Sequence, residues 1–119
     1  MYLVRDNKIE EIKGDRFSVG MLEHSMGDKD IRKHRVKLKE DDMIYLFTDG
    51  YADQFGGPEG KKYKYRRFRH LLLTIHNLDP DQQRLYLNKS IEDWKGNQEQ
   101  IDDILVVGFS PRSIVNGRE

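Results

Sequence analysis

The sequence predicts an α+β fold with a largely antiparallel sheet, and three observations support this prediction. Short apolar or alternating segments, separated by turn residues, fill the first 50 positions. Two amphipathic helical patterns then follow each other, and one apolar segment closes the pattern near residue 109. Strands and helices are therefore grouped rather than alternating as in βαβ units. With 119 residues, the chain has room for one small domain.

The N-terminal segment predicts a β-hairpin. Residues 2–5 and 8–12 read as two short strands on either side of Asp6 and Asn7. Both of these turn residues tolerate the left-handed backbone that a tight hairpin turn needs.

A second group of strand patterns follows the hairpin. Residues 17–22 are expected to form a short strand or an extended loop, and the polar residues 23–33 a loop. Val36 and Leu38 alternate with basic side chains, which predicts a half-buried strand that ends at the polar turn of residues 40–42.

Two segments, Met43 to Phe47 and Ile104 to Phe109, have the continuous apolar character of buried strands. The first ends abruptly at Thr48 and Asp49, where Gly50 is expected to let the backbone turn sharply. Residues 54–60 are rich in glycine and are predicted to form a loop.

Helical spacing predicts two helices between these strands. The apolar face of the first helix comprises Tyr65, Phe68, Leu72 and Ile75. A second helix is expected to begin after Asp79, a residue suited to the N-cap, with Pro80 at its first position and Gly96 at its end. Its inner stripe comprises Leu87, Ile91 and Trp94.

The composition argues against several classes of protein. Without cysteine, the chain cannot be a disulfide scaffold, a thiolate metal protein or an enzyme with a cysteine nucleophile. The 21 basic and 21 acidic residues balance, which argues against a general polyanion binder. No segment approaches the roughly 20 apolar residues of a membrane span, and the N-terminus turns polar at once. We therefore expect a cytoplasmic protein that binds neither membrane nor nucleic acid.

Acidic residues flank both apolar strands and mark a candidate metal site. Asp49 follows the first strand, and Asp102 and Asp103 precede the second. If the two strands are antiparallel neighbours, Asp49 and Asp102 meet at one edge of the sheet. Carboxylates held in this way suit a hard cation such as Mg²⁺ or Mn²⁺. The alternative is structural, because Asp-Gly is a common turn pair and the second acidic pair would then lie in a solvated loop.

Two segments resemble signature motifs of one protein family. Residues 46–53 (Leu-Phe-Thr-Asp-Gly-Tyr-Ala-Asp) and 100–107 (Gln-Ile-Asp-Asp-Ile-Leu-Val-Val) are similar to motifs of stage II sporulation protein E type serine phosphatases. These bacterial enzymes belong to the metal-dependent, 2C-type protein phosphatase superfamily. The order and spacing of the motifs, with a helix pair between them, also match. The resemblance runs from about residue 2 to residue 109.

The resemblance implies a β-sandwich flanked by helices and a site for Mn²⁺ or Mg²⁺. It implies that Asp49 and Asp102 ligate one catalytic metal ion, and that Asp53 occupies an acidic position linked to a weaker third metal. Asp103 is expected to orient Asp102 or to face solvent. In the complete family domain, a metal-bridged hydroxide hydrolyses phosphoserine in a phosphoprotein substrate. Such substrates serve bacterial signal transduction, often the regulation of sigma factors through an anti-sigma-factor antagonist.

The sequence also departs from the family pattern. The family's domain begins with strands that carry a metal-bridging acidic motif, and this chain has no such motif. Residues 1–110 therefore resemble the C-terminal portion of the domain, and residues 111–119 are expected to form a solvated tail. Because only part of the two-metal site is present, we expect the chain by itself to bind metal weakly and to hydrolyse little.

Two alternative functions follow from other features. Residues 61–70 interleave basic and aromatic side chains, as in nucleic-acid platforms. The zero net charge instead favours an amphipathic helix start, with Tyr65 and Phe68 buried and the basic residues solvated. The second alternative is a non-catalytic protein–protein interaction module on a phosphatase-like scaffold. A half-domain would expose sheet surface, so we expect self-association or pairing with a missing N-terminal half.

Overall fold

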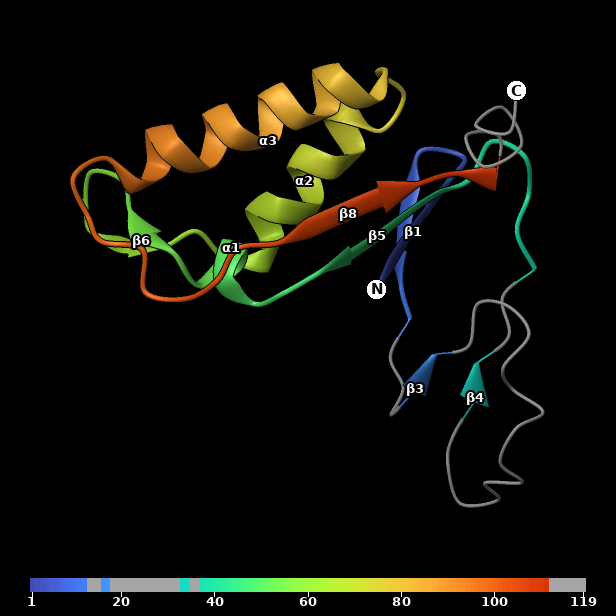
Figure 1. Cartoon of the computed structure of the whole chain (residues 1–119), viewed down its shortest axis with the longest axis horizontal. Helices are drawn as coiled ribbons and strands as arrows, with labels where there is room; N and C mark the ends of the chain where they lie inside the picture. Colours follow the sequence, from blue (N-terminus) through green and yellow to red (C-terminus); the bar gives the residue numbers. More distant parts are fainter. Residues whose placement is uncertain (13–15, 18–32, 35–36, 112–119) are drawn as a thin grey trace.

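The computed structural model describes residues 1–12, 16–17, 33–34 and 37–111 of the chain, and its central element is an antiparallel sheet (Figure 1). The predicted hairpin is confirmed: β1 (Tyr2–Arg5) pairs with β2 (Lys8–Glu11). The φ angles of Asp6 and Asn7 are 53° and 59°, which is the backbone of the expected tight turn.

Four strands form this sheet in the order β2-β1-β5-β8. The strand β5 (Met43–Phe47) lies between β1 and β8 (Val106–Phe109), and every pairing is antiparallel. The two apolar segments of the sequence are therefore neighbours, as the candidate metal site requires. β8 is shorter than the predicted strand and lies at the edge of the sheet.

Two small two-stranded sheets accompany the main one. β3 (Arg16–Phe17) pairs in parallel with β4 (Lys33–His34). β6 (Phe55–Gly56) pairs with β7 (Lys61–Lys62). The loop predicted over residues 54–60 was wrong at residues 55–56, which form β6, whereas residues 57–60 form the turn between the two strands. The glycines allow this tight turn: the φ angles at positions 57 and 60 are 72° and 63°.

Two further predictions concern the region before β5. The predicted strand around residues 36–38 is not observed, since Leu38 lies in no strand and Val36 lies outside the described residues. The loop expected over residues 23–33 and most of the segment 17–22 also lie outside them, as do residues 112–119 of the expected tail.

The predicted helix pair is confirmed. α2 (Tyr65–Ile75) buries Phe68, Leu72 and Ile75, which lie on the predicted face. α3 (Pro80–Lys95) begins after Asp79, whose carboxylate accepts a hydrogen bond of 2.9 Å from the backbone N–H of Gln82. In the part of the chain that the structure describes, no helix has the length and apolar content needed to cross a bilayer.

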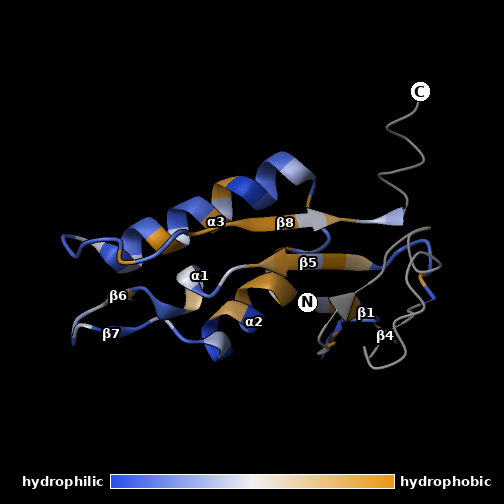
Figure 2. Cartoon of the chain, turned by 60° about the horizontal axis from the view of Figure 1, so that its bottom comes forward, coloured by the Kyte–Doolittle hydropathy of each residue, from blue (hydrophilic) through white to orange (hydrophobic). Residues whose placement is uncertain are grey.

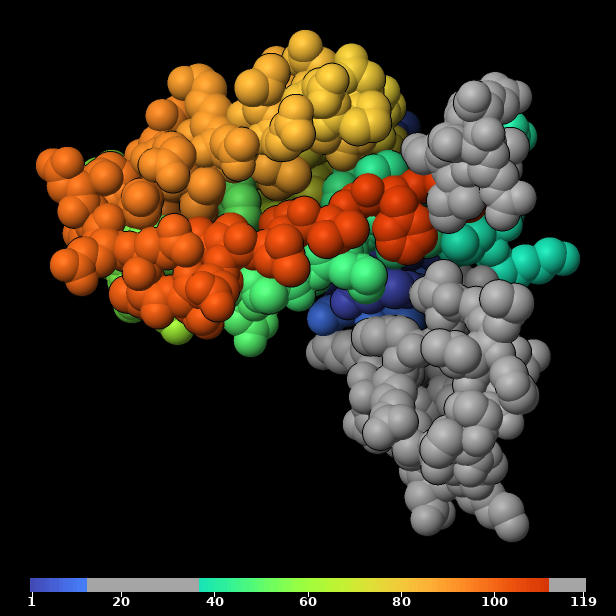
Figure 3. Space-filling model, in the orientation of Figure 1, coloured from blue at the N-terminus to red at the C-terminus, as the bar shows by residue number. Residues whose placement is uncertain are grey.

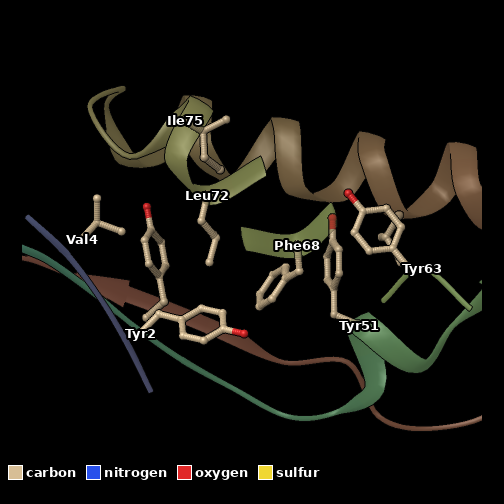
Figure 4. Close-up of a cluster of buried hydrophobic side chains, with 9 residues drawn as sticks. Tyr2, Val4, Tyr51, Tyr63, Phe68, Leu72 and Ile75 are labelled. Atoms are coloured by element: carbon tan, nitrogen blue, oxygen red, sulfur yellow. The ribbon is translucent and has the colours of Figure 1, made fainter. Parts of the chain in front are cut away.

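The helices cover one face of the sheet, and aromatic rings fill the space between the two layers (Figure 4). The Phe68 ring lies 5.0 Å from the Phe47 ring and 4.8 Å from the Tyr51 ring, measured between centroids. The buried Tyr45 hydroxyl donates to Gln83 Oε1 at 2.7 Å, and the Tyr51 hydroxyl donates to a carbonyl of α3 at the same distance. These hydrogen bonds join the sheet layer to α3, and burial raises the pKa of both tyrosines.

The opposite face of the sheet is only partly covered. Leu3, Ile12 and Ile44 form a small buried cluster there. Leu46 pairs with Val107 across β5 and β8, so both lie on this face. Together with Leu105 they form an apolar stripe. Leu46 is 38% exposed, Val107 45% and Leu105 58%. The segment 104–109 is therefore only partly buried within the chain, and Figure 3 shows β8 at the surface beside β5.

The sheet and the outer helix α3 differ in hydropathy. In Figure 2 the strands β5 and β8 are largely apolar, whereas α3 is largely polar along its length. Its buried positions include Ile91, with Leu87 and Trp94 packed against the same core. A polar helix over an apolar sheet is the pattern of an outer layer that faces solvent.

An ion pair fixes the entry to β5. Asp42 is 1% exposed and accepts hydrogen bonds from the Arg5 guanidinium at 2.9 and 2.5 Å. The backbone N–H of Lys39 also donates to this carboxylate, at 2.7 Å. The hydrogen bonds from Arg5 are the largest cause that lowers the pKa of Asp42 below its ordinary value of 3.8.

This lowered pKa predicts how acid affects stability. The ionised carboxylate stabilises the fold above the unfolded-state pKa, and this contribution is lost as the pH falls through the folded-state pKa. We expect Asp42→Asn to lower the free energy of unfolding at pH 7 by about 1–3 kcal/mol. At pH 3 the difference from the unmodified chain should be smaller, as measured by urea denaturation.

The matched control is Asp93→Asn on α3, whose exposed pair with Lys89 should contribute little at either pH. An Asp42→Asn effect of equal size at pH 7 and pH 3 would contradict the assigned role of the ionised carboxylate.

Candidate metal centre

The pairing of β5 with β8 brings the two acidic motifs to the same edge of the sheet, where β5 ends and β8 begins. Phe47 pairs with Val106 at the end of the ladder. Beyond it, Thr48 continues the contact: its N–H donates to the carbonyl of Leu105 at 3.0 Å, and its Oγ1 accepts from the N–H of Leu105 at 3.1 Å. The Thr48 hydroxyl donates to the carbonyl of Asp103 at 2.8 Å. The residue before Asp49 is therefore bonded directly to the segment that follows Asp102.

Gly50 allows this close contact because it has no side chain. A Cβ atom at this buried position would lie 2.1 Å from the carbonyl oxygen of Asp103, far inside the van der Waals distance. The backbone turns here, as expected, because Gly50 begins the one-turn helix α1 (Gly50–Asp53) shortly after β5, but Gly50 is not a position of positive φ. Close approach of two backbones is the physical reason for a glycine here.

Asp49 lies at the start of α1 with its side chain exposed. Its Oδ1 accepts a hydrogen bond from the Tyr65 hydroxyl at the start of α2. Burial is the largest cause of the raised pKa of Tyr65, and the hydrogen bond to Asp49 adds to it. Among the described residues, nothing bonds to Asp49 Oδ2, so one carboxylate oxygen is oriented and the other is open to a ligand.

Asp102 and Asp103 are both exposed and lie just before β8. The backbone N–H of Asp103 donates to Asp102 Oδ1 at 2.8 Å, which restrains the orientation of that carboxylate. The expected orienting role of Asp103 is thus performed in this structure by its backbone N–H. The third predicted ligand, Asp53, is half-buried and lies 3.7 Å from the Lys62 ammonium group.

Gln54 is a positioning residue that the sequence pattern did not identify. It is fully buried, and its Nε2 donates to the carbonyl of Glu99 at 2.9 Å. Its own carbonyl accepts from Trp94 Nε1 at 3.0 Å and from the N–H of Tyr63 at 2.9 Å. Gln54 therefore joins the end of α1 to α3, to Tyr63 just after β7 and to the segment that leads to Asp102. A glutamine in a glycine-rich stretch carries no periodic signal by which these contacts could have been found.

The donor chemistry suits a hard divalent cation, but the described residues supply only part of a coordination shell. Asp49 and Asp102 offer carboxylate oxygens, the ligand type that Mg²⁺ and Mn²⁺ prefer. Within residues 1–12, 16–17, 33–34 and 37–111, no group of three or more histidine, cysteine or acidic side chains converges on one point. Further ligands would have to come from other residues or from water.

Comparison with known proteins supports the motif resemblance. The model of the family described as stage II sporulation protein E (SpoIIE) matches residues 1–111. Among solved structures, the chain is similar to the SiaA-PP2C domain of Pseudomonas aeruginosa, with a TM-score of 0.74 and 28% sequence identity. The similarity covers 92% of this chain and 41% of that one, so this chain spans less than half of the solved domain. Among curated proteins, none matches this chain.

The contact between Gly50 and Asp103 yields a specific prediction. Gly50→Ala should lower the free energy of unfolding by about 1–3 kcal/mol, because the methyl group forces two backbones apart. It should also speed hydrogen exchange of the Thr48 and Leu105 amides, whose hydrogen bonds lie beside this contact. Urea denaturation and amide exchange observed by NMR measure the two effects.

Gly60→Ala is the control, because the nearest atom to a Cβ added at position 60 is 3.8 Å away. The alanine would be strained only by the left-handed backbone conformation of that position, whose φ is 63°. It should leave the exchange rates of Thr48 and Leu105 unchanged. Equal protection of these two amides in Gly50→Ala and in the unmodified chain would refute the close-approach argument.

Proposed function

Because this chain belongs to the stage II sporulation protein E (SpoIIE) family of 2C-type protein phosphatases, we propose that it forms the C-terminal part of a metal-dependent protein serine/threonine phosphatase. The observation that carries the proposal is the pairing of β5 with β8. It sets the Asp-Gly motif at Asp49 against the Asp-Asp motif at Asp102, in a chain whose residues 1–111 match the family.

In this proposal Asp49 and Asp102 hold one divalent cation, Mn²⁺ or Mg²⁺. Support comes from the restraint on each carboxylate, since Tyr65 orients Asp49 and a backbone N–H orients Asp102. When bound, such cations activate water and neutralise charge on the phosphoryl group. The assignment of Asp53 to a further metal has less support, because the Lys62 ammonium group lies beside it.

The proposed site is incomplete among the residues that the structure describes. The solved domain continues well beyond the matched portion, and the described residues do not assemble three acidic ligands. We therefore propose that residues of the kind found in the rest of that domain complete the metal site. The proposed substrate is a phosphoserine protein of a bacterial signalling system, such as one that regulates a sigma factor in the cytoplasm.

The apolar stripe of Leu46, Leu105 and Val107 supports the related proposal that this sheet face pairs with another polypeptide. Exposed apolar area of this kind is stabilised when a second layer covers it. The occupant in the proposal is the remainder of a phosphatase domain, and a second copy of the chain when that remainder is absent. The same observation favours the second candidate function, a non-catalytic interaction module on a phosphatase-like scaffold.

Phosphatase activity on an aryl phosphate with Mn²⁺ tests the first proposal. The chain by itself should hydrolyse little, whereas the chain extended upstream in its own reading frame should be active. Asp49→Asn should abolish the activity of the extended form, and the exposed Asp93→Asn on α3 should leave it unchanged. If neither form is active, the enzymatic function is refuted and the interaction module remains.

Light scattering at micromolar concentration tests the pairing of the sheet face. The chain by itself should self-associate, and Val107→Glu should return it to a monomer because a charge on the stripe opposes its burial. Leu85→Glu, at an exposed apolar position on α3, should leave the association intact. A monomeric unmodified chain would contradict the expected role of this face.

A further inference from the structure

The segment that carries α2 has a strong excess of positive charge. Between Glu59 and Asp79 the chain contains no acidic residue, although its overall net charge is zero. The basic side chains of this segment are Lys61, Lys62, Lys64, Arg66, Arg67 and Arg69. The first turn of α2 also lacks an acidic residue, so cations gather where the helix dipole disfavours them. An unfavourable concentration of charge of this kind becomes favourable when an anionic partner binds.

These charges line a groove. A hollow of about 930 Å³ runs beside α2 and reaches Ile9 of β2. Its lining contains the cations Lys64, Arg66, Arg67 and Arg69, together with the imidazole of His70. Leu71 and Leu73 contribute apolar surface to the same hollow. The groove therefore offers both positive charge and an apolar contact, which a simple salt-binding surface does not.

Two of the cations are held in place. The Arg67 guanidinium lies 4.5 Å from the centre of the Trp94 ring and donates to the carbonyl of Tyr63 at 2.9 Å. Arg69 donates to the Tyr2 hydroxyl at 3.4 Å. Both side chains are already ordered, so a partner that contacts them meets preorganised positive charge.

Three other polar side chains of the groove are available to a partner. The side chains of Lys64, Arg66 and His70 have no ion pair or hydrogen bond with any residue that the structure describes, and all three residues are exposed. Exposed pairs elsewhere on the surface, such as Arg84 with Asp81, have a local acidic partner. Basic side chains are thus concentrated in the groove, and those of Lys64 and Arg66 have no acidic partner among the described residues.

The chemistry of the groove favours a peptide over a nucleic acid. Tyr63 is 6% exposed and Phe68 is fully buried, while the Tyr65 hydroxyl is bonded to Asp49. The aromatic rings of this segment are therefore committed to the core or to the candidate metal centre, and cannot stack on bases as a single-strand platform requires. A concave groove with apolar side chains on its wall also fits an extended chain better than a flat bilayer surface.

We propose that this groove binds an acidic segment of a partner protein. Aspartate, glutamate or phosphoserine side chains of that segment pair with Lys64, Arg66 and His70, and an apolar side chain lies against Leu71 or Leu73. The groove lies on the helical side of the sheet, away from the apolar stripe on the opposite face. Binding there leaves the stripe free to pair with another polypeptide.

The groove and the candidate metal centre share the start of α2. Lys64 of the groove immediately precedes Tyr65, whose hydroxyl bonds to Asp49. The binding proposal goes beyond the proposed phosphatase function and does not depend on it, because the groove contains no proposed metal ligand.

Fluorescence anisotropy with a labelled peptide of alternating glutamate and leucine tests the proposal. The probe is titrated with the full 119-residue chain in EDTA, so that no metal is involved. The glutamate peptide should bind, its affinity should fall as salt is added, and a peptide with lysine in place of glutamate should not bind. The double variant Lys64→Glu with Arg66→Glu should weaken binding at least about tenfold, since two favourable charge contacts become repulsive.

The matched control is Arg84→Glu with Lys89→Glu, which makes the same change in net charge at exposed positions of α3. It should leave the affinity within about twofold, because neither residue lines the groove and salt screens exposed charges that a bound segment does not contact. Circular dichroism checks the fold of both variants. If the charge reversal at positions 64 and 66 prevents folding, Lys64→Asn with Arg66→Gln is used, and a clear loss of affinity is still expected.

Three results would overturn the proposal. One is no binding of the glutamate peptide at low salt. Another is equal loss of affinity in the two double variants, which would mean attraction by net charge alone. The third is tighter binding of a single-stranded oligonucleotide or of phosphatidylserine vesicles than of the peptide, lost through the same substitutions at positions 64 and 66.

Discussion

The close backbone contact between Gly50 and Asp103 is the constraint on which the candidate site depends. Hydrogen bonds from Thr48 hold the two segments together, and the missing side chain at position 50 lets them approach. The contact joins the end of β5 to the start of β8, so that two acidic motifs far apart in the sequence share one edge of the sheet. The contact also explains why a glycine follows Asp49: a side chain at position 50 would collide with the carbonyl of Asp103.

Among the described residues, helices cover one face of the sheet, whereas the other face is only partly covered. On the helical face, Phe68 and the buried tyrosines fill the space, and the tyrosine hydroxyls find acceptors on α3. On the other face, Leu46 and Val107 remain partly exposed. This chain covers 41% of the similar solved domain. The described residues assemble no group of three acidic or histidine ligands at the candidate metal site. That site and the apolar stripe are the two surfaces that the proposed pairing with another polypeptide concerns.

The orientation of the candidate ligands depends on residues that no local motif contains. Tyr65 reaches Asp49 from the start of α2, and Gln54 bonds to the carbonyl of Glu99 from the end of α1. Asp49 and Asp102 were recognisable because each follows or precedes an apolar strand in a short motif. Their supporting residues were not, since a hydrogen bond between segments many positions apart leaves no periodic pattern in the chain. For Asp53 the sequence suggested a metal ligand from its position in the motif. Only the fold revealed that the Lys62 ammonium group lies beside it.

Local chemistry in the sequence was enough to determine the hairpin, both apolar strands, the helix pair and the residues that α2 buries. These follow from turn preferences at Asp6 and Asn7, from helical spacing around Phe68, and from the N-cap at Asp79. Tertiary structure alone decided which side chains of β8 are exposed, the one-turn helix after Asp49, and the gathering of α2 cations beside Ile9 in a groove. The physical reason is that these features depend on contacts between segments far apart in the sequence. An apolar pattern specifies that a face tends to be buried, but whether it is buried depends on which other segment packs against it.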